Sequence, residues 1–372
     1  MSKLEKLIQQ YCPDGVEYKA LGEVTIMKRG TSATKGIMQE GNIPVISGGR
    51  QPAFYCNASN RTGEVITVAG SGAGAGYVQY WNEPIFVCDA FSIQGNETLN
   101  TKYVYYVLTS IQEKIYSTKK GGGVPHVHIS SIDKFEIPVP PLPVQEEIVR
   151  VLDAFTELQA ELQAELQKRK QQYNFYRDNL LNFKDINRGG EQEIKWMKLG
   201  KMCSVLRGKR LTKSQLSSYG RYKVFHGGIE PIGRYDECNR EANTTMVINV
   251  GASAGTVGFS KDMFWSSDGC FCLSHTPLLS GRYLYYYLQT REPYLMSRVR
   301  RAGIPTLDGK VLEELIIPVP PLAEQNRIVS ILDRFDILTN DLTSGLPAEM
   351  EKRRQQYEFY RDKLLTFKRK EA

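Results

Sequence analysis

IPVPPLPVQEEIVRVLD, residues 137–153, recurs as IPVPPLAEQNRIVSILD, residues 317–333. A second block, QQYNFYRDNLLNFK at residues 171–184, recurs as QQYEFYRDKLLTFK at residues 355–368. The second copy holds four extra residues between the two blocks. Because two long blocks recur in the same order, the chain is an internal duplication of one unit.

Each unit begins with a globular part whose ends match the other copy and whose middle diverges. Upstream matches are weaker, as between residues 21–22 and 199–200. Short β-rich runs such as GEVITVAG and TTMVINVG precede an aromatic helical segment in each copy. We therefore expect two similar globular domains, at residues 16–143 and 187–323. We interpret their aromatic stripes as core rather than binding sites.

Each globular part is followed by a helical pattern, because apolar residues recur three, four or seven positions apart over residues 144–186 and 324–372. A narrow apolar seam needs a partner helix, and we expect the two helices to pair. The expected fold class is α+β: two similar globular α/β domains joined by two long antiparallel helices that form a coiled coil, with a pseudo-two-fold internal repeat. Gly345 and Pro347 predict a break in the second helix. Residues 1–15 are predicted as a short N-terminal helix.

Composition limits the class of protein. The formal net charge of +7 and the sequence pI near 8.9 permit a polyanionic partner. No apolar run approaches the ~20 residues that span a bilayer, so no membrane partner is expected. The opening sequence MSKLEKLIQQYC lacks the apolar stretch of a signal peptide, and we expect a cytoplasmic protein. The seven cysteines are scattered without a CxxC pair, which favours reduced thiols over a zinc site.

Two motifs suggest catalysis, but neither has the required spacing. Asp14 and Glu17 are close in sequence, whereas the carboxylates of a nuclease metal site normally come from different strands. The glycine run GSGAGAG, residues 70–76, matches neither GxGxxG nor GxxxxGK[ST], and we interpret it as a tight turn. The chain also lacks an NPPY-type or DPPY-type tetrapeptide. We therefore expect no catalytic residue.

His126 and His128 have the HxH spacing of metal ligands. Thr306 and Asp308 replace them in the second copy, so a metal shared by both units is not expected. Contact with DNA, or a structural role in the loop, is the favoured interpretation of the two histidines.

Basic clusters flank glycine-rich loops at equivalent places in the two copies. A single cluster is usually a solvated surface, but recurrence beside loops that can approach a phosphate backbone favours nucleic acid. An arginine there can also read guanine through two hydrogen bonds. The predicted DNA-binding residues are Lys28, Arg29, Lys35, Lys119, Lys120, His126, His128, Arg207, Lys209, Arg210, Lys213, Arg298, Arg300 and Arg301.

The repeated blocks resemble those of type I restriction-modification specificity subunits. The resemblance rests on PDGVEYKALGEV near the start, on IPVPPLxxQ after each globular part and on YxFYRDxLLxF at the end of each helix. It implies a non-catalytic subunit with two target recognition domains, each of which reads one half of a split, asymmetric DNA sequence. It also implies that the helices dock other subunits. The candidate docking residues are Tyr173, Tyr176, Arg177, Tyr357, Tyr360 and Arg361.

The resemblance also implies a set of partners. They are double-stranded DNA, two methyltransferase subunits and restriction-translocase subunits. The chain itself is expected to bind no cofactor, because S-adenosylmethionine, ATP and Mg²⁺ belong to those partner subunits. The methyltransferases are expected to flip an adenine out of the duplex and methylate its N6.

The first helix contains LQAELQAEL, with two copies of Leu-Gln-Ala-Glu between Leu158 and Glu165. Members of the family resemble this chain in having short repeats there. Four residues make about one helical turn and roughly 6 Å of length. A change of one repeat is therefore expected to alter the spacing between the two DNA halves by one or two base pairs, at about 3.4 Å per base pair.

Three alternative functions remain open. A stand-alone nuclease or methyltransferase predicts that the purified chain modifies DNA unaided. A coiled-coil adaptor without a DNA role predicts that any DNA binding depends little on salt, whereas phosphate contacts predict a steep fall. A relative that serves a type IIB-like enzyme would share the same sequence blocks.

Overall fold

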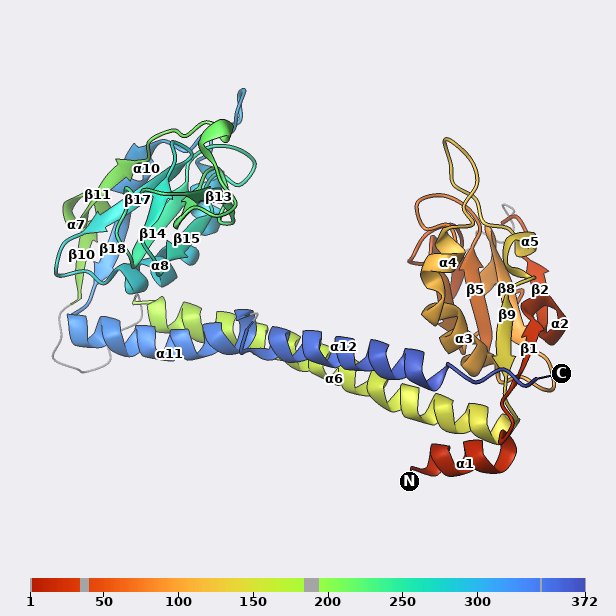
Figure 1. Cartoon of the computed structure of the whole chain (residues 1–372). Helices are drawn as coiled ribbons and strands as arrows, with labels where there is room; N and C mark the ends of the chain where they lie inside the picture. The colour runs from red at the N-terminus through yellow and green to blue at the C-terminus, as the bar shows by residue number, and fades with distance from the viewer. Residues whose placement is uncertain (1, 34–39, 184–193, 342, 372) are drawn as a thin grey trace. The chain divides into compact units, whose positions relative to one another are not determined.

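The computed structural model describes residues 2–33, 40–183, 194–341 and 343–371. The chain divides into two compact units, one made of Met1–Gln163 with Glu349–Ala372 and the other of Ala164–Ala348. Each unit contains one globular domain and segments of the long helices (Figure 1). The predicted boundary between residues 186 and 187 lies outside the described residues, and the predicted domain limits stay predictions.

The first globular domain combines three small sheets with short helices. The elements of this part of the chain are α1 (Lys3–Tyr11), β1 (Glu17–Ala20), α2 (Leu21–Val24), β2 (Thr25–Arg29), β3 (Ile43–Ile46), β4 (Phe54–Cys56), β5 (Val65–Ala69), β6 (Val78–Trp81), β7 (Phe86–Val87), β8 (Ala90–Gly95), α3 (Thr101–Ser110), α4 (Gln112–Tyr116), α5 (Ile129–Ile132), β9 (Glu136–Val139) and the long helix α6 (Leu142–Leu181). The largest sheet has the order β2-β8-β5-β6 and is antiparallel. The others are β4-β3-β7, in which β3 and β7 are parallel, and β1-β9. Strand β5, VITVA, is buried along its whole length, as expected for an interior strand of small and β-branched residues.

The second globular domain repeats this topology strand for strand. Its elements are β10 (Lys195–Lys198), α7 (Leu199–Met202), β11 (Cys203–Arg207), η1 (Lys213–Gln215), β12 (Tyr222–Phe225), β13 (Pro231–Tyr235), β14 (Thr244–Ile248), β15 (Val257–Ser260), β16 (Phe264–Ser266), β17 (Cys270–His275), α8 (Gly281–Gln289), α9 (Glu292–Ser297), α10 (Gly309–Glu313) and β18 (Ile316–Val319), followed by helices α11 (Leu322–Asn340) and α12 (Leu346–Leu364). The sheets are β11-β17-β14-β15, β13-β12-β16 and β10-β18. The α+β fold class with two similar domains and long helices is therefore confirmed.

The aromatic stripes belong to the core. On α3, Tyr103 is fully buried and Tyr106 is nearly so. Tyr283 occupies the equivalent place on α8 and is also fully buried. The hydroxyls of Tyr103 and Tyr283 donate to the carbonyl oxygens of Pro138 and Pro318 respectively, each at 3.1 Å. Because each buried hydroxyl has a partner, the stripes pack without an unsatisfied polar group.

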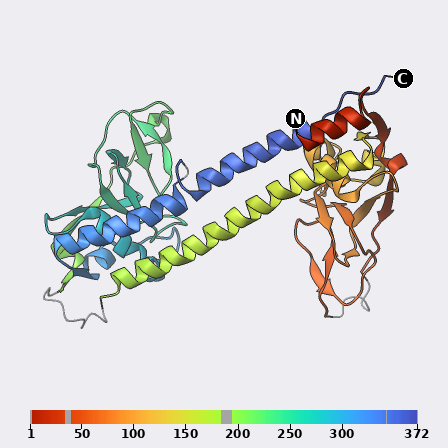
Figure 2. The ribbon, with the colours of Figure 1, turned by 90° about the horizontal axis from the view of Figure 1, so that it is seen from below.

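The predicted apolar seam joins antiparallel helices in both units. In the first unit, the early part of α6 lies antiparallel beside α12 (Figures 1 and 2). Phe155 of α6 stacks there on Tyr360 of α12, with ring centroids 5.6 Å apart. In the second unit, the late part of α6 lies antiparallel beside α11, and Tyr176 stacks on Phe335 at 5.5 Å. Each helix thereby covers apolar side chains that would face water on an isolated helix.

The second long helix is broken where Gly345 and Pro347 predicted a break. Helix α11 ends at Asn340 and α12 begins at Leu346. Pro347 therefore lies in the first turn of α12, where a missing N–H leaves no helical bond unmade. Gly345 has no room for a side chain, because a Cβ there would lie 2.3 Å from the carbonyl oxygen of Ile337.

Three helices are shorter than predicted. Helix α1 ends at Tyr11, α6 at Leu181 and α12 at Leu364. The prediction of helix up to residue 372 is wrong, because the backbone beyond α12 bonds to the start of the first domain (Figure 1). The N–H of Val16 donates there to the carbonyl oxygen of Lys368 at 2.8 Å. Within the described ranges, no helix combines the length and apolar character needed to cross a membrane.

The glutamine of the repeated IPVPPLxxQ block joins each domain to its helix. Gln145 is fully buried, and its Nε2 donates to the carbonyl oxygens of Pro140 at 2.6 Å and Thr98 at 2.9 Å. Its Oε1 accepts the N–H of Asn100 at 2.8 Å. One side chain thus satisfies three backbone groups that lie on either side of the joint. The equivalent Gln325 bonds in the same way to Pro320, Leu278 and Ser280.

The aspartate that closes the same block makes a second bond between domain and helix. The Tyr106 hydroxyl donates to Asp153 Oδ1 at 2.5 Å, and Lys102 Nζ lies 2.8 Å from Asp153 Oδ2. Burial and this hydrogen bond raise the pKa of Tyr106. The second unit places Tyr286 and Arg282 against Asp333 at 2.6 and 2.7 Å. The first repeated block, at residues 137–153 and 317–333, is therefore explained by a repeated joint between domain and helix.

Candidate nucleic-acid interface

A glycine-rich loop projects from the first domain at the end remote from α6 (Figure 1). This first hairpin loop consists of residues 120–126. Its ends pair as an antiparallel bridge, in which the N–H of Lys120 donates to His126 at 2.9 Å and the N–H of His126 donates back at 2.8 Å. Val124 stands near the tip and is 55% exposed. The loop therefore has closed ends and a tip that faces solvent.

The base of the first hairpin loop is bonded to the turn after β5. The N–H of Gly72 donates to the carbonyl oxygen of Pro125 at 3.0 Å, and the N–H of Val127 donates to Gly70 at 2.9 Å. Val127 is itself buried. The run GSGAGAG is thus the tight turn that the sequence predicted, and it supports the loop.

The second hairpin loop, residues 300–306, has the same construction. Arg300 and Thr306 exchange backbone hydrogen bonds of 2.9 and 3.0 Å. Ile304 stands where Val124 stands in the first loop and is 70% exposed. The N–H of Gly251 donates to Pro305 at 2.9 Å, and the N–H of Leu307 donates to Asn249 at 2.8 Å.

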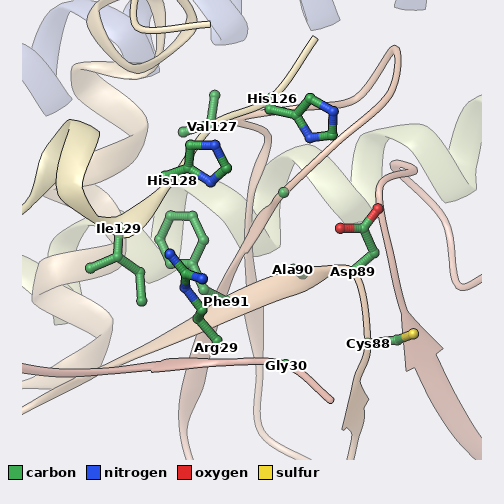
Figure 3. Close-up of a pocket in the computed structure, with 11 residues that line it drawn as sticks. Arg29, Gly30, Cys88, Asp89, Ala90, Phe91, His126, Val127, His128 and Ile129 are labelled. Atoms are coloured by element: carbon green, nitrogen blue, oxygen red, sulfur yellow. The ribbon is translucent and has the colours of Figure 1, made fainter. Parts of the chain in front are cut away.

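A pocket beside the first hairpin loop brings together three of the predicted residues, Arg29, His126 and His128. The imidazole rings of His126 and His128 are parallel, with centroids 6.0 Å apart. In Figure 3, Arg29 and His128 lie on one side of the pocket and Asp89 on the other. The Ser71 hydroxyl donates to the Asp89 carboxylate. The lining residues are Arg29, Gly30, Gly70, Cys88, Asp89, Ala90, Phe91, His126, Val127, His128 and Ile129.

The other predicted residues of the first domain lie apart from this pocket. Lys28 is exposed and precedes Arg29 on β2, so it projects from the opposite face of the strand. Lys119 lies over the ring of Tyr116, with its nitrogen 4.1 Å from the ring centre. Lys35 falls outside the described residues.

The predicted residues of the second domain are exposed along two loops. Arg207 ends β11, and its Nε donates to the carbonyl oxygen of Asp268 at 3.3 Å. Arg298 lies over the ring of Tyr294, with its guanidinium carbon 5.0 Å from the ring centre. Exposed cations follow β11 at Lys209, Arg210 and Lys213, and stand in the second hairpin loop at Arg300 and Arg301. The loops of this domain thus present exposed arginine and lysine side chains, and Thr306 and Asp308 stand where the first domain has its two histidines.

Two arginines that were not predicted from the sequence have side chains that bond to the last residues of β2 and β11, Arg29 and Arg207. Arg61 donates from Nη2 to the carbonyl oxygen of Arg29 at 2.9 Å and from Nε to the Ser92 hydroxyl at 2.7 Å. Arg240 donates from Nη2 to the carbonyl oxygen of Arg207 at 2.8 Å. Burial lowers the pKa of Arg61. The available signal was an Asn-Arg dipeptide that recurs at residues 60–61 and 239–240.

Comparison with known proteins shows to which family the duplicated unit belongs. The model of the type I restriction modification DNA specificity domain matches residues 13–169 and, a second time, residues 191–352. The chain belongs to the family of type I restriction-modification DNA specificity subunits. DNA recognition is thus the role of this family within its restriction system.

The specificity subunit is similar to known relatives over its length. It is 31% identical to the EcoR124I/EcoR124II specificity subunit of Escherichia coli, across 100% of this chain and 98% of the relative. It is also 31% identical to a putative type I specificity subunit of Haemophilus influenzae, across 98% of each. The crystal structure of a type I S subunit from M. genitalium matches with a TM-score of 0.68 and 20% identity, across 94% of this chain and 96% of that one. This structural likeness supports the fold.

The predicted docking residues of the specificity subunit mostly face its own helices. Tyr173 is buried, and burial raises its pKa. Burial likewise raises the pKa of Tyr357 to about 12. Arg177 and Arg361 lie over the rings of these two tyrosines, with guanidinium carbons 5.6 and 5.8 Å from the ring centres. Tyr176 and Tyr360 are partly exposed but stack within the seam.

Two exposed phenylalanines on the same helices were missed. Phe175 is 64% exposed and Phe359 is 63% exposed. Each contacts the tyrosine that follows it, with ring centroids 5.6 and 5.4 Å apart. Because they occupy the same position of the repeated YxFYRD block, they form equivalent apolar surfaces on the two units.

The described residues offer no evident metal site. Among them, no group of three or more His, Cys, Asp and Glu side chains is placed to hold an ion. The described loops instead present cationic side chains and backbone N–H groups. Such groups donate hydrogen bonds to phosphate oxygens and base edges.

Proposed function

We propose that this specificity subunit reads a bipartite, asymmetric DNA sequence, with one half read by each globular domain. The proposal rests on the observation that the two domains share one architecture but carry different exposed side chains. Both domains share strand order, hairpin loop and joint, whereas the first carries His126 and His128 where the second carries Thr306 and Asp308. Because the two domains have the same architecture, we expect them to bind the DNA backbone in the same orientation. Because their exposed side chains differ, we expect them to prefer different bases.

We further propose that the chemistry resides on partner subunits. In this proposal, two methyltransferase subunits methylate adenine at N6 with S-adenosylmethionine, and restriction-translocase subunits use ATP and Mg²⁺. This chain contributes the placement of those subunits on DNA, and it needs no cofactor for that task.

Exchange of one domain tests the reading of half-sites. Residues 16–143 are replaced by the corresponding domain of a related subunit, and the chimera is produced with the methyltransferase. Long-read methylation mapping is expected to show that one half of the methylated sequence changes and the other half persists. The control is the reciprocal exchange of residues 187–323, which should change only the other half. Simultaneous change of both halves after either exchange would contradict the proposal.

The two exposed phenylalanines are the proposed anchors for the methyltransferase subunits. Aromatic side chains that are exposed on a monomer are frequent anchors of protein interfaces, and two equivalent anchors fit two copies of one partner. We expect Phe359→Ser to reduce the methyltransferase recovered with the purified chain from two copies to one, and the double variant with Phe175→Ser to abolish recovery.

Native mass spectrometry of the purified complex measures this stoichiometry. Leu278→Ser is the matched control, because Leu278 is 65% exposed but lies in a loop of the second globular domain. The control should retain two methyltransferase copies. Retention of both copies by the double phenylalanine variant would show that docking occurs elsewhere.

A further inference from the structure

The tips of both hairpin loops carry an exposed β-branched residue followed by proline. The first loop reads GGGVPH and the second RAGIPT at residues 121–126 and 301–306. A single exposed apolar residue is common on protein surfaces. Here the same type of residue stands at the same place in two domains, although most of the surrounding loop has changed. That recurrence indicates a role which requires an apolar tip.

The tips are held away from the body of each domain. A side chain added at Gly122, Gly123 or Gly303 would meet no atom within 4 Å, so the tips stand in open space. Their bases are nevertheless fixed, because Pro125 and Pro305 each accept a backbone N–H from the adjacent turn at 3.0 and 2.9 Å. A stiff base under an open tip allows the tip to enter a groove without first being ordered.

Positive charge borders both tips. Lys119 and Lys120 precede the first, and Arg300 and Arg301 precede the second. Lys120, Arg300 and Arg301 are exposed, and no ion pair with another described residue engages them. Such side chains are available to phosphates on the borders of a DNA groove, where they would direct the apolar tip toward the bases.

We propose that Val124 and Ile304 are wedges that insert between stacked bases, one in each half of the DNA target. The proposal rests on the proposed reading of a bipartite sequence. An aliphatic side chain has no hydrogen-bonding group with which to read a base edge, but it can replace base stacking on one side of a step. The neighbouring proline stiffens the wedge and adds apolar surface. Each domain thereby unstacks one base step in its half-site.

Permanganate oxidation of thymines tests the wedges, because unstacked thymines react faster than stacked ones. The full chain, assembled with its methyltransferase, is bound to duplexes that contain its target. We expect one reactive step in each half. Val124→Ser should abolish the reactive step only in the half read by the first domain, and Ile304→Ser only in the other. Each variant should lower the affinity of the complex for its DNA target about tenfold. This is the smallest loss expected when one aliphatic side chain that is buried against the DNA is removed.

Controls separate insertion from other effects. The thymine opposite the methylated adenine is scored apart, because base flipping exposes it as well. Val124→Ile and Ile304→Val should preserve both reactive steps. Arg300→Ala should weaken binding and lower its salt dependence while preserving both reactive steps at saturation.

Two results would contradict the proposal that Val124 and Ile304 insert between bases. One is an unchanged permanganate pattern despite weaker binding by the serine variants, which would indicate a surface contact. The other is wild-type affinity and pattern in both variants. Failure of the proposed function has a different signature, since the wild-type complex would then bind its mapped target no better than a random duplex.

Discussion

Deletion of Leu162–Glu165 is expected to shorten the unspecified stretch between the two DNA halves by one or two base pairs while both halves stay the same. These residues form one LQAE repeat within α6, which is continuous from Leu142 to Leu181 and connects the two domains along the chain. Removing four helical residues shortens the connection by roughly 6 Å. At about 3.4 Å per base pair, that length corresponds to one or two base pairs.

The deletion should leave the helix packing nearly intact. Leu158 and Leu162 are half-buried and Leu166 is buried. After the deletion, Leu166 takes the place of Leu162 one turn after Leu158. Four residues exceed one turn by a small rotation, so the apolar seam keeps its direction and the domains should fold as before.

Methylation mapping of cells that express the variant with its methyltransferase measures the outcome. Methylation at the original spacing should fall to background and appear at the shorter spacing. Insertion of a third LQAE copy is the matched control and should lengthen the spacing by the same amount. Altered half-sequences, or unaltered spacing, would contradict the role assigned to α6.

The duplication made much of the fold predictable. Two recurring blocks predicted two similar domains and two helices, and Gly345 with Pro347 predicted the helix break. Strand order was not predictable, because pairings such as the parallel one between β3 and β7 join residues far apart in the chain. Local periodicity carries no information on such partners. The bond between Val16 and Lys368 escaped prediction for the same reason.

The candidate interface was predictable in its charges but not in its shape. Recurring cations pointed to Arg29 and Arg207, yet the pocket of Arg29, His126 and Asp89 depends on three separate chain segments. The exposed Phe175 was overlooked because the seam pattern selects Tyr173 and Tyr176 around it. Its recurrence outside the seam was the usable signal, since an aromatic residue that is mostly exposed contributes little to the core and has no packing reason to recur at the same position.

Gln145→Ala is expected to lower the free energy of unfolding of the first unit by about 3 kcal/mol. The substitution leaves the N–H of Asn100 and the carbonyl oxygens of Thr98 and Pro140 without their side-chain partner in a buried joint. Gln145→Glu should destabilise at least as strongly. A carboxylate in place of the donating Nε2 would face two carbonyl oxygens, and repulsion would replace two hydrogen bonds.

Hydrogen exchange followed by mass spectrometry gives a local measure, because a chain with two units need not unfold in one step. Peptides that contain Asn100 should exchange roughly a hundredfold faster in Gln145→Ala, as 3 kcal/mol implies. The adjacent Glu146 is exposed, so Glu146→Ala should change stability by less than about 0.5 kcal/mol.

The second unit supplies an internal comparison. Gln325→Ala removes the equivalent three bonds there and should accelerate exchange around Ser280, while peptides around Asn100 keep wild-type rates. Equal exchange in Gln145→Ala and Glu146→Ala would show that the joint is held by its apolar contacts alone. Faster exchange confined to the altered unit would instead mean that IPVPPLxxQ recurs because each domain must be fixed to its own helix.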